Sequence, residues 1–134
     1  IVLHKNKEAV QDFTIKDGEH AFVFEIVDSV IEEPRSTHIH IGKNARVEYV
    51  YILDSIDNSY VDNRIIEIGD GAEVNSHYFI LGAQNNNSLS LWHKIGKQAQ
   101  VNHNVLIIGD KEQQFALAEK YNFLSNIFLF SNNL

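Results

Sequence analysis

Apolar and polar residues alternate along most of this 134-residue chain, in short runs separated by turn residues. Between residues 13 and 110 the runs are rich in β-branched and aromatic residues, and Gly, Asn and Asp mark the breaks. A period of two is typical of strands that bury one face, and no helical period is found in this range. The pattern predicts an all-β protein.

A heptad recurs at a constant interval of 27 residues, as IGKNARV at 41–47, IGDGAEV at 68–74 and IGKQAQV at 95–101. A degenerate earlier copy, IKDGEHAFVFEIV at 15–27, has Lys16 in place of the glycine and a spacing of 26. Each copy reads as strand, tight turn, strand. This period suits one coil of a parallel β-helix, in which like residues of successive coils form columns. We predict such a β-helix core over residues 1–115.

The repeat register predicts which side chains face the core. The Ala and Val of each heptad would stack inward, and the alternation continues that face along the following strand. The predicted inner columns are Ala45/Ala72/Ala99, Val47/Val74/Val101, Tyr51/Tyr78/Val105 and Leu53/Ile80/Ile107. Such columns would bury a continuous core.

The opposite face of the same strands carries a second apolar column, formed by Ile52, Phe79 and Leu106. A solvated strand face should be polar, and strands that are apolar on both sides are normally covered on both. Either another part of the same chain or a second subunit could cover this column. Ile52, Phe79 and Leu106 are therefore the candidate interface residues.

The last residues depart from the repeat. The segment QQFALAEKYNFLSNIFLFSNNL, at 113–134, could begin as a short helix and then becomes strongly apolar. We expect residues 116–134 to cap the open end of the stack or to begin a further region. Because the chain contains no methionine at all, we also expect it to be a fragment.

The composition narrows the classes of partner. The chain has 11 basic and 18 acidic residues, and the basic ones are scattered, which disfavours nucleic acid. No apolar run approaches the roughly 20 residues of a membrane span, so no membrane partner is expected either. Without cysteine the chain can form neither disulfides nor thiolate metal sites. A cytoplasmic location is the expectation.

Two groups of polar residues raise the question of a metal site. His38 and His40 form an HxH pair on one strand face, with Glu48 following, which faintly resembles the ligand set of a cupin. The second cupin motif is missing, and a 27-residue stack does not build a cupin barrel, so no metal ligand is predicted. His40 also shares a column with Glu67 and Lys94, which predicts an exposed charge ladder of little energetic weight.

Further polar residues fall on neighbouring rungs of the predicted stack. His103 lies one rung from Ser76, and His77 lies one rung from Asn104. A strand spacing of about 4.8 Å would bring each pair into contact. Polar ladders of this kind usually satisfy one another's hydrogen bonds, so a structural role is favoured over a ligand role.

The stretches IHIGKNARVEYVYIL at 39–53 and NRIIEIGDGAEVNSHYFILGAQNNNSLSLWHKIGKQAQVNHNVLIIGDKEQQF at 63–115 resemble the SufB/SufD family of iron–sulfur cluster assembly proteins. The likeness is one of repeat cadence and covers roughly residues 20 to 115. It implies a right-handed parallel β-helix. It also implies a subunit that pairs with a SufB- or SufD-like partner, as a homo- or heterodimer, and recruits a SufC-type ATPase.

This chain departs from the family in two respects. The cysteine of the SufB branch has no counterpart, and nothing matches the family's C-terminal part, which carries a histidine-containing segment and the helices that dock SufC. The resemblance therefore implies a SufD-like or truncated core. No cluster ligand is carried over, and an iron–sulfur cluster is expected only in the assembled complex.

The leading expectation is a non-catalytic scaffold subunit of a SufBCD-type assembly complex. No catalytic residue is predicted, since the chain has no nucleophile elbow, phosphate loop or paired-carboxylate motif. One alternative is a polysaccharide-active β-helix enzyme, for which Glu48, Asn75 and Asn102 supply only one carboxylate. The other is a structural β-solenoid that polymerises end to end.

Overall fold

The computed structural model describes residues 2–5, 10–27, 34–54, 61–81, 87–109, 115–124 and 129–133. These residues form strands and no helix, so none of them belongs to a helix that could cross a membrane. The strands are β1 Val2–Lys5, β2 Val10–Ile15, β3 His20–Val27, β4 Arg35–Ile41, β5 Arg46–Asp54, β6 Val61–Ile68, β7 Glu73–Leu81, β8 Asn87–Ile95, β9 Gln100–Ile108, β10 Phe115–Phe123 and β11 Leu129–Asn133.

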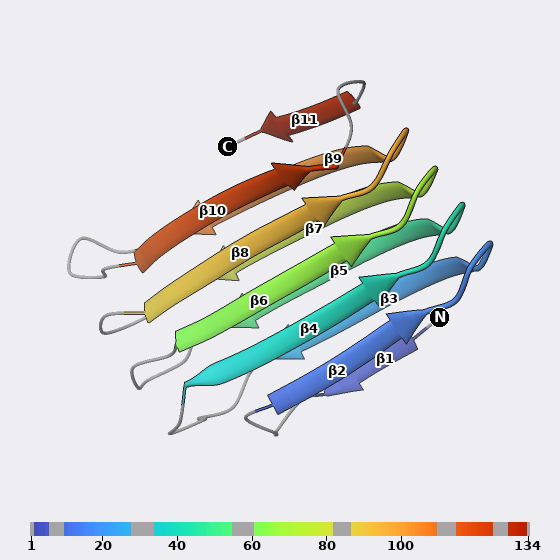
Figure 1. Cartoon of the computed structure of the whole chain (residues 1–134). Coiled ribbons are helices and arrows are strands. Elements are labelled where there is room, and N and C mark those ends of the chain that lie inside the picture. The colour runs from blue at the N-terminus through green and yellow to red at the C-terminus, as the bar shows by residue number, and fades with distance from the viewer. Residues whose placement is uncertain are drawn as a thin grey trace.

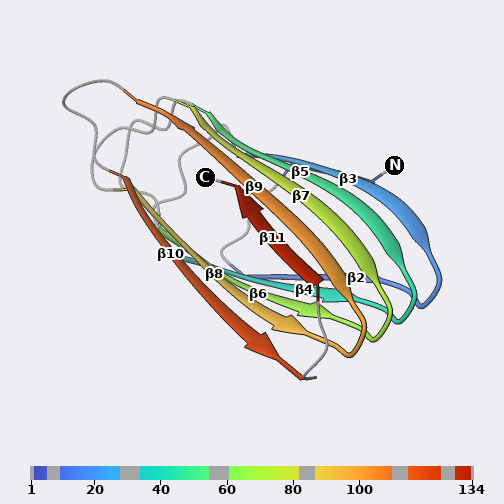
Figure 2. The same cartoon turned by 90° about the horizontal axis from the view of Figure 1, so that it is seen from above.

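The strands form two sheets. The odd sheet has the order β1-β3-β5-β7-β9-β11 and the even sheet the order β10-β8-β6-β4-β2. Figure 1 shows the strands of each sheet stacked in parallel, and Figure 2 shows the two sheets facing each other, joined by tight turns at one edge. One coil is an even strand, its tight turn and the next odd strand. The predicted stack of parallel coils is confirmed.

The strand register follows the sequence repeat. Val47 pairs with Val74 and Val74 with Val101, at the predicted interval of 27. Ala21 pairs with Val47, which reproduces the interval of 26 for the degenerate first copy. The heptad therefore marks the same corner of every coil.

Glycine is needed at that corner because successive coils approach closely. The Gly69 amide donates to the Ile41 carbonyl of the preceding coil at 2.8 Å. A Cβ on Gly69 would lie only 2.7 Å from the backbone nitrogen of Lys43. Two residues further along, Gly71 has a φ of 70°, and Asn44 in the previous coil takes the same left-handed conformation with a φ of 55°.

The core lies between the two sheets. The predicted Ala and Val columns are buried, as are Tyr51, Tyr78, Val105, Leu53 and Ile80. Ile107 is exposed instead, although it continues the Leu53/Ile80 column. The reason is that β11 pairs with β9 only over 100–104, so no described strand lies on the next rung beside Ile107.

The expected helix in the C-terminal segment is wrong, because Phe115–Phe123 forms strand β10. Its larger side chains recur with a period of two, and it pairs in parallel with β8 along its whole length. Leu129–Asn133 forms β11 and adds a last strand to the odd sheet. The segment thus supplies the terminal strand of each sheet.

Candidate functional site

The outer face of the odd sheet carries the predicted apolar column. Ile52 pairs with Phe79 and Phe79 with Leu106, and the pairing of Ile26 with Ile52 extends the column to a fourth strand. Leu106 is 48% exposed, and the other three side chains are half-buried. The even sheet faces the inner side of the odd sheet, so none of the described strands covers the column (Figure 2).

Neighbouring side chains widen the column into a larger surface. Phe24 and Val50 adjoin it on one side, and Leu81 and Ile108 on the other. We call this surface the outer apolar patch, formed by Phe24, Ile26, Val50, Ile52, Phe79, Leu81, Leu106 and Ile108. Contiguous exposed apolar surface of this kind is typical of interaction sites.

Polar ladders run beside the outer apolar patch. Asn75 Nδ2 donates to Glu48 Oε1 at 2.6 Å, and Asn102 Nδ2 donates to Asn75 Oδ1 at 2.8 Å. On the adjacent column, Asn104 Nδ2 lies 3.3 Å from His77 Nδ1, which confirms the predicted contact. These ladders link side chains of successive coils and give the patch a polar border.

A shallow hollow of about 390 Å³ lies over this border, lined in part by Phe22, Glu48 and Glu73. It brings a second carboxylate close to Glu48, which the polysaccharide-enzyme alternative requires. Glu73 is nevertheless paired with Arg46, whose Nε lies 3.4 Å from Glu73 Oε2. Both carboxylates are thus already engaged with neighbouring side chains.

The interior contains an ionic network that the sequence reasoning missed. Arg64 Nη2 donates to Glu25 Oε2 and to the Tyr49 hydroxyl, both at 2.6 Å, and Arg64 Nη1 donates to Asp62 Oδ2 at 3.1 Å. The Tyr49 hydroxyl donates to Glu25. Arg35 Nη2 lies 3.5 Å from Glu25 Oε1. Two arginines balance two carboxylates, and all four side chains are buried.

The network sets the charge states of Glu25, Arg64 and Tyr49. Burial alone would raise the pKa of Glu25, but the Arg64 charge and its hydrogen bonds outweigh burial and lower it. Burial likewise opposes the charge on Arg64, yet Glu25 and the neighbouring acidic groups hold its pKa well above the usual value. Burial raises the pKa of the Tyr49 hydroxyl, so it stays neutral and donates. The network is buried, which indicates a structural role.

A second buried cluster joins the two sheets nearer the C-terminal end of the stack. Ser76 Oγ lies 2.7 Å from His103 Nδ1, as the register predicts, and His103 Nε2 lies 2.8 Å from Glu119 Oε1. A carboxylate only accepts, so Nε2 carries the proton and Nδ1 accepts from the serine hydroxyl. Burial lowers the pKa of His103 although Glu119 opposes that shift, which keeps the ring neutral.

This serine–histidine–glutamate chain has the connections of a nucleophile and its base. Both Ser76 and His103 are buried, however. The adjoining cavity, lined partly by Ser76, Tyr78 and His93, is about 10 Å³. That volume suits about one water molecule, and no substrate would fit. The cluster therefore has a structural role, linking the two sheets through buried hydrogen bonds.

His93 completes the cluster. Its ring stacks on Tyr121 with centroids 5.0 Å apart and meets His103 edge-on at 5.2 Å. Its Nδ1 is buried and has no hydrogen-bond partner among the described residues. Burial and, to a smaller extent, His103 lower the pKa of His93 to about 3.

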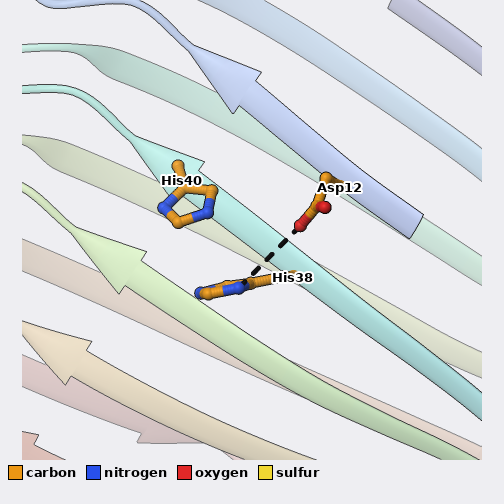
Figure 3. Close-up of side chains that lie close together, drawn as sticks. All are labelled: Asp12, His38 and His40. Atoms are coloured by element: carbon orange, nitrogen blue, oxygen red, sulfur yellow. Dashed lines mark ion pairs between the residues drawn. The ribbon is translucent and has the colours of Figure 1, made fainter. Parts of the chain in front are cut away.

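The HxH pair lies on the outer face of the even sheet. Figure 3 shows His38 and His40 on β4 beside Asp12 of β2. One ligand atom from each of these three residues lies within 4.8 Å of the other two. Glu48 lies on the odd sheet, so the cupin-like grouping of His38, His40 and Glu48 is not assembled.

Glu67 of β6 borders the same pair. Its Oε2 lies 2.9 Å from His40 Nδ1, and its Oε1 lies 3.5 Å from His38 Nε2. Lys94 Nζ donates to Glu67 Oε1 at 2.9 Å, which confirms the His40/Glu67/Lys94 column. That hydrogen bond is the main reason why the pKa of Glu67 is lowered.

Comparison of the chain with models of protein families, with curated proteins and with solved structures finds no match. The resemblance to the SufB/SufD family therefore rests on the repeat cadence. Function has to be proposed from the fold and from the surfaces described above.

Proposed function

We propose that this chain is a non-catalytic scaffold subunit that pairs through the outer apolar patch with a second β-solenoid subunit. The observation that carries the proposal is the continuous apolar column from Ile26 to Leu106 across four strands. A column of this length on a sheet face favours a partner with a similarly regular face. The described strands leave these side chains partly exposed, and pairing would bury them away from water.

The polar border supports the same interpretation. Interaction surfaces commonly have an apolar centre and a polar rim. Here the Glu48–Asn75–Asn102 ladder lies on one side of the patch and already has its hydrogen bonds within the chain. A partner could therefore cover the apolar column without leaving these groups unsatisfied. The buried interior clusters, in turn, favour a scaffold over an enzyme.

We further propose that the partner is a SufB- or SufD-like subunit and that the pair recruits a SufC-type ATPase for iron–sulfur cluster assembly. This step rests on the resemblance of the repeat to that family. Any cluster would be built on the assembled complex.

The pairing is tested with Phe79→Asp, which places a charge in the centre of the patch. We expect self-association, measured by sedimentation velocity, to weaken at least about 100-fold, as for loss of an interface hot spot. Ser90→Asp is the matched control, because it adds the same charge on the half-buried outer face of the even sheet. Circular dichroism checks that both variants are folded.

A Phe79→Asp variant that is folded and still paired contradicts the proposed interface. If the unaltered chain is monomeric, it is co-expressed with a SufB-type subunit and a SufC-type ATPase. We expect a complex of all three that the Phe79→Asp change disrupts. Recovery of the chain without either partner overturns the iron–sulfur assignment. A homodimer without these partners supports the pairing and contradicts the iron–sulfur assignment.

A further inference from the structure

The outer face of the even sheet brings metal-binding side chains together from three adjacent strands. Asp12 of β2 pairs with His38 of β4, and His40 of β4 pairs with Glu67 of β6. His38 and His40 are two residues apart, so the pleat directs both imidazoles to the same side. Their ring centroids are 4.0 Å apart.

The contact with Glu67 leaves one nitrogen of His40 available as a ligand. Glu67 Oε2 lies 2.9 Å from His40 Nδ1, and a carboxylate this close favours the tautomer that carries its proton on Nδ1. The lone pair then lies on Nε2. A carboxylate that holds the second nitrogen of a histidine is a common feature of metal sites, because it fixes the tautomer and the orientation of the ring.

His38 lies between the two carboxylates. Its Nδ1 is 3.9 Å from Asp12 Oδ1, and its Nε2 is 3.5 Å from Glu67 Oε1. The Nε2 atom is buried and makes no hydrogen bond with the residues that the structure describes. The Nδ1 atom faces the carboxylate of Asp12, whose side chain is 76% exposed.

We propose that Asp12, His38 and His40 bind one divalent first-row transition metal ion, with Glu67 orienting His40. Two imidazoles and one carboxylate suit ions such as Zn²⁺ and Co²⁺, whereas Mg²⁺ prefers oxygen ligands alone. Ligand atoms around a tetrahedral Zn²⁺ lie about 3.3 Å apart. The three groups are within 4.8 Å of one another, so a shift of the exposed Asp12 side chain and small ring rotations would close the site.

The surrounding charges favour a cation. Asp12 and Glu67 contribute two negative charges, and Lys94 compensates one of them through its hydrogen bond to Glu67. Lys94 approaches Glu67 Oε1 and leaves Oε2 with His40. Glu67 is thus held as the orienting group, and the metal takes its ligands from β2 and β4.

Metal binding would join the first coils of the stack, since its ligands belong to neighbouring strands of the even sheet. An ion that binds only the folded chain raises its thermal stability. This inference does not depend on the proposed pairing, because the site and the outer apolar patch lie on opposite sheets.

The test uses the untagged full chain after dialysis against a chelator. Zn²⁺ and Co²⁺ are the probes, and Mg²⁺ is the negative control. We expect one Zn²⁺ per chain by calorimetry, together with shifts of the His38 and His40 imidazole resonances in the NMR spectrum. His40→Ala should weaken Zn²⁺ binding at least about 100-fold, since loss of even an orienting partner costs about 10- to 100-fold.

His77→Ala is the matched control. His77 is half-buried on the outer face of the odd sheet and also faces a glutamate, Glu48, at 3.8 Å. This variant should bind Zn²⁺ as the unaltered chain does. Asp12→Asn, at an exposed position, should bind at least about tenfold more weakly and gives a second test if His40→Ala does not fold.

Absence of Zn²⁺ binding at millimolar concentration overturns the site. So does binding that His40→Ala and His77→Ala weaken equally, which would indicate general surface adsorption. Equal binding of Mg²⁺ and Zn²⁺ would also contradict it, because the imidazoles would then take no part.

Discussion

Close to the tight turns, the interior of the solenoid is filled by the same residue types in each coil. Further along the strands, polar clusters that change from coil to coil interrupt the apolar packing. At the turn end the core holds stacked Ala, Val and Ile columns. Further along, the column that contains Val23 continues as Tyr49, Ser76 and His103. One interior thus contains two kinds of packing.

The difference reflects which neighbours fix each position. At the turn end each coil lies against the backbone of the previous one, so every coil needs the same small or apolar residue. Further along, the decisive partner lies across the core, on the other sheet. Glu25 of the odd sheet meets Arg64 of the even sheet, and His103 of the odd sheet meets Glu119 of the even sheet.

The largest expected effect is on the ionic network. Arg64→Leu should fit sterically, because the next residue in its column is Leu91. It would leave Glu25 and Asp62 buried without their main partner, so we expect a loss of about 3–5 kcal/mol of unfolding free energy. Urea denaturation at pH 7 measures this loss.

The double variant Glu25→Gln with Arg64→Leu separates charge from packing. Removing the carboxylate charge as well should restore part of the lost stability, because less uncompensated charge stays buried. If the single variant costs no more than about 1 kcal/mol, Arg64 is not the centre of the network.

The two kinds of packing also explain what the sequence could predict. The repeat predicts neighbours 26 or 27 residues apart, which is why the turn-end columns and the Ser76–His103 contact could be predicted correctly. Glu25 and Arg64 are 39 residues apart and meet across the core, so no column contains both. The available signals were Glu25, a charged residue at an inward position between Val23 and Val27, and Arg64, which shares the inward strand face of Ile66 and Ile68.

Two further differences between the sequence prediction and the structure have local causes. The segment after residue 115 contains Ala, Glu and Lys, which favour a helix, but its apolar residues have the strand period, and pairing with β8 decides the outcome. The Asp12–His38 contact was missed because the degenerate first copy was recognised only from Ile15 onward. Extending its register backward would have placed Asp12 beside His38.

At the turn end the expected effect comes from backbone proximity. Gly69→Ala would place a Cβ 2.7 Å from Lys43 N and 2.8 Å from Gly42 C, and neither is a flexible side-chain end. We expect a loss of roughly 1–3 kcal/mol, as for overpacking of a core, measured by urea denaturation.

Gly18→Asn is the control for this change. Gly18 has a φ of 69°, and a Cβ added there would meet no atom within 4 Å. Asn44 has a φ of 55° at the same position of the next turn. Since Asn tolerates this conformation, the variant should lie within about 0.5 kcal/mol of the unaltered chain. Equal effects of the two changes would mean that the close approach of successive coils is not the reason for glycine at position 69.

The polar interior should also make the protein sensitive to mild acid. The pKa of His93 is lowered from 6.5 to about 3, so between these values the unfolded chain binds a proton that the folded chain does not. Stability therefore falls as pH falls below about 6.5, by about 2 kcal/mol between pH 7 and pH 5 from this residue. The lowered pKa of His103 acts in the same direction.

His93→Phe removes the titrating group and keeps a ring against Tyr121. Because Nδ1 of His93 makes no hydrogen bond with described residues, this change should cost little at pH 7. Urea denaturation at pH 7 and pH 5 should show a smaller loss for the variant, by about 2 kcal/mol. Parallel profiles for the two proteins would show that His93 is not buried in its neutral form.

The smallest effect is expected for an ion pair of the same residue types at the surface. Arg46 and Glu73 are exposed, and Arg46 Nε lies 3.4 Å from Glu73 Oε2. Arg46→Leu should change the unfolding free energy by less than about 1 kcal/mol, because water screens both charges and solvates Glu73 when its partner is lost. The small change should shrink further in high salt, whereas the loss in Arg64→Leu should persist. A loss at Arg46 as large as that at Arg64 would show that burial is not what distinguishes the two arginines.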